Sequence, residues 1–147
     1  FVCQGNICRS AYADIRAQTL GLPSASLGLA TSTGQPAFRL AQEAASRRGL
    51  DLSDHRATDI SDFEIRGGDL LLVMEVRQAR KLVSASLPSG VGIALLGNWS
   101  RPLRIHIHDP YELEPSYFDT CFGVIDNALD RLAAAWSLRG SVEMPEK

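Results

Sequence analysis

The sequence predicts an α/β domain in which a four-stranded parallel sheet carries helices on both faces. Short apolar runs alternate with helical stretches along the chain, an order that favours parallel strands joined by crossover helices. Residues 70–74 form a continuous apolar run, which is typical of a strand covered on both faces. No repeat, linker or low-complexity segment divides the sequence. We therefore expect a single domain over residues 1–147.

The candidate strands are residues 1–2, 25–30, 70–74 and 91–96. The first is only a stub, because the chain starts at Phe1, without Met, at what has the pattern of a strand end. We expect several residues of this strand to precede Phe1, which would make the first strand truncated in this numbering.

The candidate helices are residues 10–20, 36–48, 76–83 and 115–138, with a short helical turn at 62–65. Pro36 suits a first helical turn, and Gly49 suits the end of the same helix. The last helix carries one apolar stripe, made of Phe118, Phe122, Ile125, Leu129, Leu132 and Ala133. Residues 84–92 and 97–102 are expected to be loops.

Composition narrows the class of protein. The chain is 45% hydrophobic and 22% charged, which indicates a globular domain with a packed core. A net charge of -2 gives no support for nucleic acid or an anionic membrane as a partner. No apolar run approaches the roughly 20 residues of a membrane span. Three cysteines form a poor disulfide framework and indicate a reducing, cytoplasmic location, and their spacing does not suit a zinc site.

The segment between the first strand and the first helix reads Cys-Gln-Gly-Asn-Ile-Cys-Arg-Ser and spans residues 3–10. A loop in this place can point successive backbone N–H groups at one anion, and the helix N-terminus adds partial positive charge. Gly5 permits backbone conformations that other residues resist, and Asn6 tolerates the left-handed region. The sequence therefore predicts an anion-binding loop over residues 3–9, called loop 3–9 below.

Cys3, Arg9 and Ser10 are the reactive candidates of this loop. The planar Arg9 guanidinium can bind two phosphate oxygens at once, and the same positive field favours the thiolate form of Cys3. The Ser10 hydroxyl can donate to that sulfur. The alternative is that Cys3 is a small buried hydrophobic residue and Arg9 a surface charge. The pattern Cys-x5-Arg-[Ser/Thr] arises by chance in roughly one chain in a hundred of this length. A P-loop nucleotide hydrolase is excluded, because no Gly-Lys-[Ser/Thr] follows a glycine loop.

The segment Val-Cys-Gln-Gly-Asn-Ile-Cys-Arg-Ser at residues 2–10, which contains loop 3–9, resembles the active-site signature of the low-molecular-weight protein tyrosine phosphatases. Four further segments are similar to that family, namely Ser26-Leu27-Gly28 with Gly34-Gln35-Pro36, His55-Arg56-Ala57, the apolar strand from Asp69 to Met74, and Asp109-Pro110-Tyr111. The resemblance implies strand order 2-1-3-4 and an active site at the carboxyl ends of the strands. It also implies which residues contact phosphate or substrate: Gln4, Gly5, Asn6, Ile7, Cys8, Arg9 and Tyr111.

The resemblance further implies a two-step mechanism that needs no metal and no other cofactor. Cys3 attacks phosphorus and forms a cysteinyl-phosphate, and Asp109 protonates the leaving oxygen and later activates water. Arg9 and the loop amides stabilise the charge, and Ser10 eases departure of the sulfur. Asp109 has a plainer alternative role as a turn residue before proline.

Asn6, Ser26 and His55 match residues that support the loop from behind in this family. The alternatives are a strand-end serine and a histidine satisfied in the core or at the surface. For Cys8 the family suggests a protective disulfide with Cys3, whereas a small buried wall residue is the other interpretation.

The expected substrates are a phosphorylated protein, through phosphotyrosine, or a small aryl phosphate, with inorganic phosphate as product. The rim departs from the family, because Ser32 and Thr33 stand where a bulky residue is common, Glu112 replaces a second tyrosine and Gln4 replaces an apolar residue. We therefore expect weakened selectivity for aryl phosphates.

Two other functions stay open at this point. An arsenate reductase also uses a Cys-x5-Arg loop, but it needs a thiol relay, and no downstream cysteine pair is present. A phosphate-binding pseudoenzyme is the second alternative, which retention of Cys3, Arg9 and Asp109 disfavours.

Overall fold

The structure, a computed structural model that describes residues 1–140, confirms the predicted sheet. Four parallel strands lie in the order β2-β1-β3-β4. Their bounds are Val2–Cys3 for β1, Leu27–Gly28 for β2, Leu70–Val73 for β3 and Gly92–Leu95 for β4. The register pairs Cys3 with Gly28 on one side of β1 and Val2 with Val73 on the other. Cys3 is therefore the last residue of a strand in the interior of the sheet.

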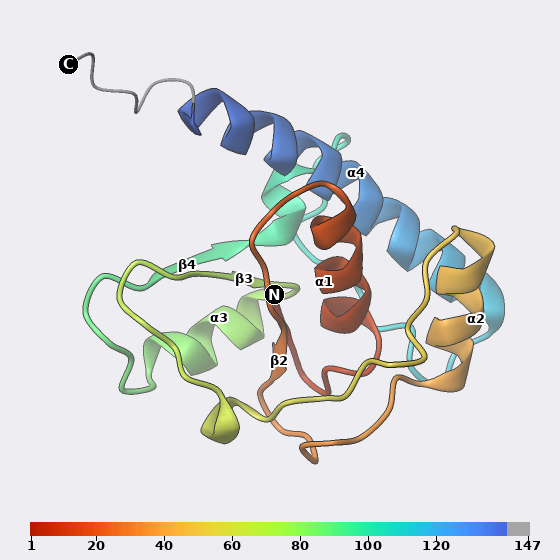
Figure 1. Ribbon diagram of the computed structural model, residues 1–147, viewed down its shortest axis with the longest axis horizontal. Coiled ribbons are helices and arrows are strands. Elements are labelled where there is room, and N and C mark those ends of the chain that lie inside the picture. The colour runs from red at the N-terminus through yellow and green to blue at the C-terminus, as the bar shows by residue number, and fades with distance from the viewer. Residues whose placement is uncertain (141–147) are drawn as a thin grey trace.

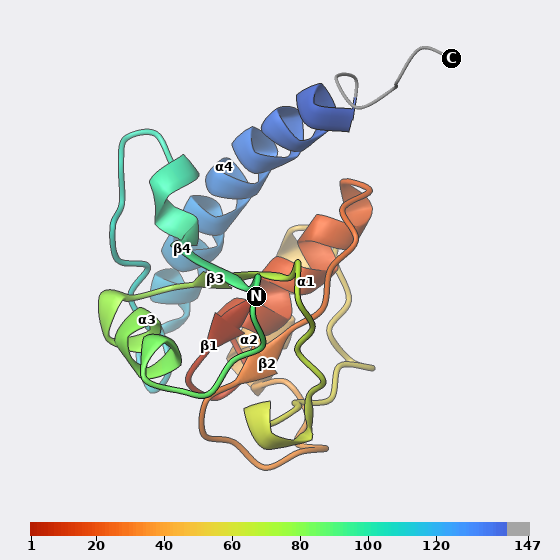
Figure 2. The same cartoon turned by 90° about the vertical axis from the view of Figure 1, so that its left-hand side faces the viewer.

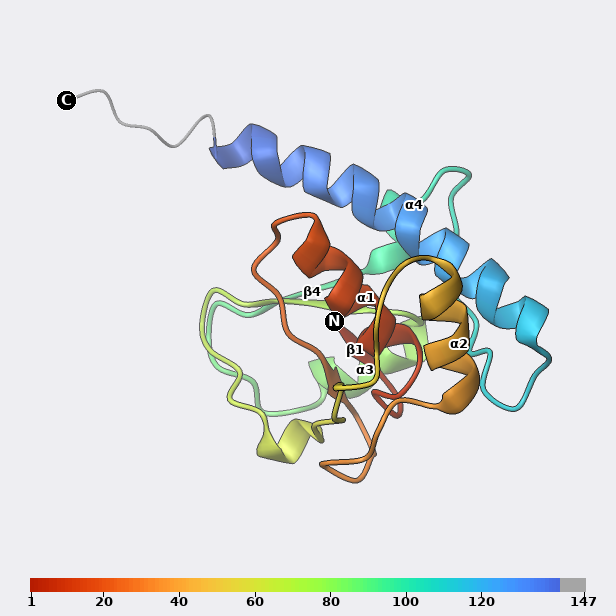
Figure 3. The ribbon, with the colours of Figure 1, turned by 45° about the vertical axis from the view of Figure 1, so that its right-hand side comes forward.

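Helices cover both faces of the sheet (Figures 1 and 2). The larger core lies under α1, α2 and α4, which span Arg9–Thr19, Arg39–Arg47 and Pro115–Gly140. The smaller core lies under α3, which spans Val76–Val83. Figure 3 shows α2 beside the first half of α4, in agreement with the contacts between these helices. None of the helices in residues 1–140 is both long enough and apolar enough to cross a bilayer.

Alternation along β3 explains its apolar sequence. Leu72 packs in the larger core, whereas Leu71 and Val73 pack in the smaller one, as expected when successive side chains point to opposite faces. Leu70 departs from the prediction, because it lies at the start of the strand and is 42% exposed. In α4, the predicted stripe is buried from Phe118 to Leu132.

Three expected boundaries are wrong. The short helical turn expected at 62–65 is a 3-10 helix that spans Ile60–Asp62. The second helix begins at Arg39 rather than near Pro36, because Pro36 instead forms an isolated bridge with Arg56. The expected loop at 97–102 begins inside a 3-10 helix, Leu96–Trp99. A side chain at Gly97 would collide with the Arg104 carbonyl oxygen, so the close approach of these two segments requires glycine.

Candidate active site

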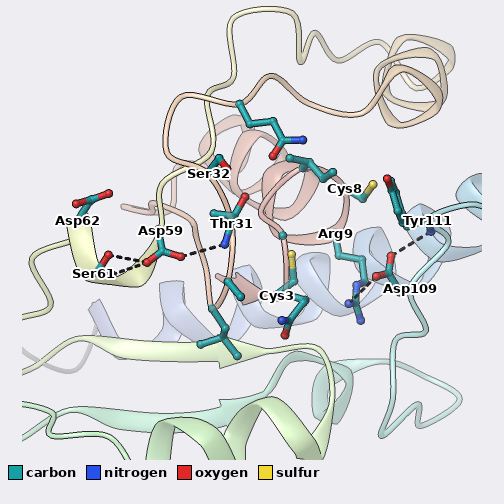
Figure 4. Close-up of a pocket in the computed structure, with 16 residues that line it drawn as sticks. Cys3, Cys8, Arg9, Thr31, Ser32, Asp59, Ser61, Asp62, Asp109 and Tyr111 are labelled. Carbon is teal, nitrogen blue, oxygen red and sulfur yellow. Dashed lines mark hydrogen bonds and ion pairs between the residues drawn. The ribbon is translucent and has the colours of Figure 1, made fainter.

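Loop 3–9 runs from Cys3, the last residue of β1, to Arg9, the first residue of α1, and it forms the floor of a pocket of about 850 Å³. Figure 4 shows Cys3 at the centre of this pocket, with Arg9, Asp109 and Tyr111 on one side and Asp59 on the other. The parallel strands bring these segments to one edge of the sheet, as open α/β sheets do.

Two polar groups lie close to the Cys3 sulfur and are placed to stabilise negative charge on it. The backbone N–H of Asn6 donates to Cys3 Sγ at 3.3 Å, and Ser10 Oγ lies 2.9 Å from the same sulfur. Ser10 belongs to the first turn of α1, whose N-terminus adds partial positive charge. Cys3 is only 3% exposed, so the sulfur is reached from the pocket rather than from bulk solvent.

Asn6 locks the shape of the loop. Its φ of 53° lies in the left-handed region, and the positive φ is at Asn6 and not at Gly5, where the sequence also allowed it. The Asn6 side chain donates to Ser10 Oγ at 2.8 Å and to Ser26 Oγ at 2.9 Å. Its oxygen accepts from the Thr58 backbone N–H at 2.9 Å. These bonds hold Asn6 in a conformation that asparagine tolerates better than most residues.

His55 supports the same residue from another direction. Its Nε2 lies 2.7 Å from the Asn6 carbonyl oxygen. The structure thus brings together Asn6, Ser26 and His55, the three residues expected behind the loop. Asn6 is fully buried and does not line the pocket, whereas Gln4, Gly5, Ile7 and Cys8 do.

Arg9 is only 1% exposed, and three groups hold its guanidinium. One terminal nitrogen donates to Glu75 Oε1 at 2.5 Å and to the Ile107 carbonyl at 2.8 Å. The other lies 3.3 Å from Asp109 Oδ2. Burial alone would lower the pKa of Arg9, but the negative charges of Cys3, Asp109 and Glu75 raise it, so the guanidinium stays charged.

Glu75 is a site residue that the sequence reasoning missed. It lies two residues after the end of β3 and caps α3, and its second oxygen pairs with Arg77 at 2.7 Å. Burial raises the pKa of Glu75, but the hydrogen bond and charge of Arg9, with Arg77, outweigh burial and lower it overall. Its position was a usable signal, because a carboxylate that follows the apolar run 70–74 lies near the carboxyl ends of the strands, where the site was expected.

Asp109 and Tyr111 form one side of the pocket mouth. Asp109 Oδ1 accepts from the Tyr111 backbone N–H at 3.1 Å, which orients the carboxylate. Tyr111 packs edge-on against Phe38, with ring centroids 4.9 Å apart. The carboxylate thus lies next to the guanidinium, and the Tyr111 ring also lines this side of the pocket.

The opposite side of the mouth was largely unforeseen. Two segments build it, and their lining residues are Leu29, Ala30, Thr31, Ser32 and Gln35 from one, and Asp59, Ser61 and Asp62 from the other. Of these, Ser32 was named from the sequence as a rim residue, and Gln35 only within a segment similar to the family. The remaining residues follow no motif, because their place in the pocket depends on how the segments after β2 and before β3 fold together.

Cys8 and Cys121 are buried and, like Cys3, free. Burial, with the charges of Asp109 and Cys3, raises the pKa of Cys8 far above its usual range, and burial raises that of Cys121 to about 12. Both are therefore thiols near neutral pH. Within residues 1–140, no group of three or more His, Cys, Asp or Glu side chains is placed to hold a metal ion.

The comparisons with known proteins agree with this geometry. Residues 1–142 match the family model described as low molecular weight phosphotyrosine protein phosphatase. The chain is 36% identical over 140 residues to the probable low molecular weight protein-tyrosine-phosphatase AmsI of Erwinia amylovora, covering 92% of this chain and 94% of that protein.

Two solved structures are also similar. The low molecular weight protein tyrosine phosphatase from T. tengcongensis has a TM-score of 0.81 and 29% identity, covering 92% of this chain and 96% of that one. Vibrio vulnificus Wzb in complex with benzylphosphonate has a TM-score of 0.74 and 27% identity, covering 91% and 94%.

Proposed function

Because the chain belongs to the low molecular weight protein-tyrosine-phosphatase family, we propose that Cys3, Arg9, Ser10 and Asp109 carry out the family's phosphotyrosine hydrolysis in this protein. The enzyme class and the cysteinyl-phosphate intermediate follow from the family, whereas the roles of individual residues are our assignment. One observation carries it: a buried thiol, a buried guanidinium and a carboxylate line a single pocket.

In the first step, the Cys3 thiolate attacks phosphorus in line with the leaving oxygen. The S–P bond forms as the P–O bond to the tyrosine breaks, and Asp109 transfers its proton to the departing phenolate. Loop amides and Arg9 bind the three equatorial oxygens, over which charge spreads in the transition state. Arg9 suits this task because Glu75 and the Ile107 carbonyl hold one of its nitrogens and thereby fix the plane of the guanidinium.

In the second step, water attacks the cysteinyl-phosphate. Asp109, now ionised, takes a proton from the water as the new P–O bond forms and the S–P bond breaks. Inorganic phosphate leaves and the Cys3 thiolate returns. The Ser10 hydroxyl, 2.9 Å from the sulfur, donates to the thiolate as it departs and makes it a better leaving group.

The substrate enters with its phosphate at the floor and its aromatic ring at the mouth. Ile7, Leu29 and Tyr111 supply apolar surface there. The relative in complex with benzylphosphonate supports an aryl group in this position, and free aryl phosphates are proposed as small substrates. Because Tyr111 is the one aromatic side chain among the described residues that line the pocket, we keep the expectation of weakened selectivity for aryl over alkyl phosphates.

Hydrolysis of p-nitrophenyl phosphate and phenyl phosphate by the wild type and two variants tests these assignments. We expect Cys3→Ser to lose activity by roughly 10⁴-fold or more while still binding phosphate. We expect Asp109→Asn to lose roughly 10²–10³-fold on phenyl phosphate, and less on p-nitrophenyl phosphate, whose leaving group needs less protonation. An active Cys3→Ser enzyme, or equal losses on both substrates for Asp109→Asn, would contradict the roles.

The family match favours hydrolysis over the two alternatives considered from the sequence. An arsenate reductase would need a second reactive thiol, and the pKa values of Cys8 and Cys121 are raised by burial. A pseudoenzyme would have no need of a carboxylate placed next to the guanidinium.

A further inference from the structure

The proposed mechanism leaves one side of the pocket without a role. Asp59, Ser61 and Asp62 line the pocket opposite Asp109 and Tyr111, and Figure 4 shows these three residues across the hollow from Tyr111, with Cys3 between the two sides. We call them the acidic wall. Because they share the cavity of the nucleophile, any substrate bound for hydrolysis is exposed to their charge.

The charge of the pocket changes between floor and mouth. Arg9 is the one cationic side chain among the described residues that line it, and it lies at the floor, where the dianionic phosphate binds. The anionic side chains are Asp59, Asp62 and Asp109. Two of these three carboxylates belong to the acidic wall, so the mouth beyond the phosphate is negative.

The wall is built rigidly enough to act as a recognition surface. Asp59 accepts from the Thr31 backbone N–H at 3.0 Å, and it also accepts from the Ser61 hydroxyl at 2.7 Å and the Ser61 backbone N–H at 3.0 Å. These bonds, the Ser61 side chain first, lower the pKa of Asp59, so it is ionised near neutral pH. Asp62 is oriented by the Thr33 hydroxyl at 2.5 Å, and its side chain is exposed at the mouth.

The pocket also extends beyond the space that a phosphotyrosine side chain fills when its phosphate lies at the floor. Its volume is about 850 Å³, and phosphate with an aromatic ring occupies the part between loop 3–9 and Tyr111. The residues that flank phosphotyrosine in a protein substrate therefore lie at the mouth, within reach of the wall. Opposite charges there raise the rate of productive encounter, and like charges lower it.

We propose that the acidic wall makes this enzyme prefer phosphotyrosine flanked by lysine or arginine over phosphotyrosine flanked by acidic residues. This inference rests on the proposed function and adds the class of protein substrate to it. The preference belongs to recognition and not to chemistry, since Asp59 and Asp62 do not contact the reacting atoms.

The experiment compares three phosphotyrosine peptides that differ only in having lysine, glutamine or glutamate on both sides of the phosphotyrosine. For the wild type we expect kcat/KM to fall in that order, with roughly 10-fold between lysine and glutamate, as two partly exposed carboxylates would give. The ratio should shrink in 0.5 M salt, because exposed charges are screened there.

Three variants locate the origin of the ratio. Asp62→Asn should reduce the ratio of lysine to glutamate peptides about 3-fold, and Asp62→Lys should invert the preference. Glu64→Gln is the matched control, because it also removes one carboxylate near this segment, but Glu64 does not line the pocket and pairs with Arg66 instead. Its ratio should stay at the wild-type value.

The possible failures are distinguishable. An enzyme inactive on all three peptides and on p-nitrophenyl phosphate overturns the proposed function itself. An enzyme active on p-nitrophenyl phosphate with equal kcat/KM on the three peptides overturns the inference alone. Equal losses of preference in Glu64→Gln and Asp62→Asn would assign the preference to the net charge of the protein. That result would also overturn the inference.

Discussion

The floor of the pocket and the acidic wall are held together in different ways. At the floor, Asn6, Ser10 and Arg9 are almost without exposure, and the hydrogen bonds of their side chains are buried or partly buried. At the wall, Ser61 and Asp62 are exposed and bonded to neighbours at the surface. A change at the floor leaves buried polar groups without partners, which is costly, whereas a change at the wall is solvated by water.

This difference separates what the enzyme does from what it prefers. Phosphate chemistry depends on groups that cannot move without breaking several buried hydrogen bonds. Substrate preference depends on exposed side chains that can change one at a time. We therefore expect variants at the floor to lose activity on every substrate, and variants at the mouth to change the ranking of substrates.

Among residues that support the loop without reacting, the largest effect is expected at Asn6. Asn6→Ala removes three side-chain hydrogen bonds and places alanine at a φ of 53°, which costs roughly 1–2 kcal/mol in strain alone. We expect kcat/KM for p-nitrophenyl phosphate to fall at least about 100-fold, with a loss of about 3 kcal/mol in the free energy of unfolding. Asn6→Gly is the matched control, because it removes the same three hydrogen bonds but glycine adopts this φ without strain. Near-normal kinetics in Asn6→Ala would refute the view that the floor is rigid.

A smaller loss is expected at Glu75. Glu75→Gln keeps the shape of the side chain but removes the charge that pairs with Arg9. We expect kcat/KM to fall by about 10-fold, mainly through a higher KM, because the guanidinium is less firmly placed for phosphate. Arg77→Gln serves as control: it removes the other, exposed partner of Glu75, and its kinetics should stay within about 2-fold of wild type.

The same pair sets a pH dependence of stability. The pKa of Glu75 is lowered in the folded protein, so its contribution is fully present above the unfolded value of about 4.3 and is lost as pH falls through the folded value. The difference in unfolding free energy between wild type and Glu75→Gln, about 2 kcal/mol near neutral pH, should therefore begin to shrink as pH falls below about 4.3 and shrink further with each step of acidification toward the folded value. Denaturant titrations between pH 3 and 8 measure it; a difference that grows on acidification would contradict the assigned ion pair.

The smallest effect, a gain, is expected at the mouth. Ser32→Trp would place a second aromatic ring across from Tyr111, and one aromatic contact is worth on the order of 1 kcal/mol. We expect kcat/KM on a phosphotyrosine peptide, divided by that on an alkyl phosphate, to rise by about 5-fold. Steady-state kinetics on both substrates give the ratio, and an equal change on both would show that the substitution had reached the floor.

Several features of the site were predictable because they are local in the sequence. Cys3, Asn6, Arg9 and Ser10 lie in one continuous segment, so the strand, the loop and the helix that follow one another fix their arrangement. The parallel sheet was predictable for a similar reason, since the alternation of apolar runs with helical periodicity is itself a local pattern.

Other features depend on segments that are distant in the sequence. Arg9 and Glu75 are 66 residues apart, and no periodicity relates an arginine in one loop to a glutamate after another strand. The start of α2 was misplaced for the same kind of reason, because a bridge between Pro36 and Arg56 replaced the first helical turn.

By itself, the sequence determined the fold class and the position of the loop between β1 and α1 that holds the proposed nucleophile, because contiguous residues encode both through backbone geometry and apolar periodicity. Only the tertiary structure decided which carboxylate holds Arg9 and which charges line the mouth. Those depend on the register of β1 beside β3 and on the packing of the segments after β2 and before β3, which arise when distant parts of the chain pack together.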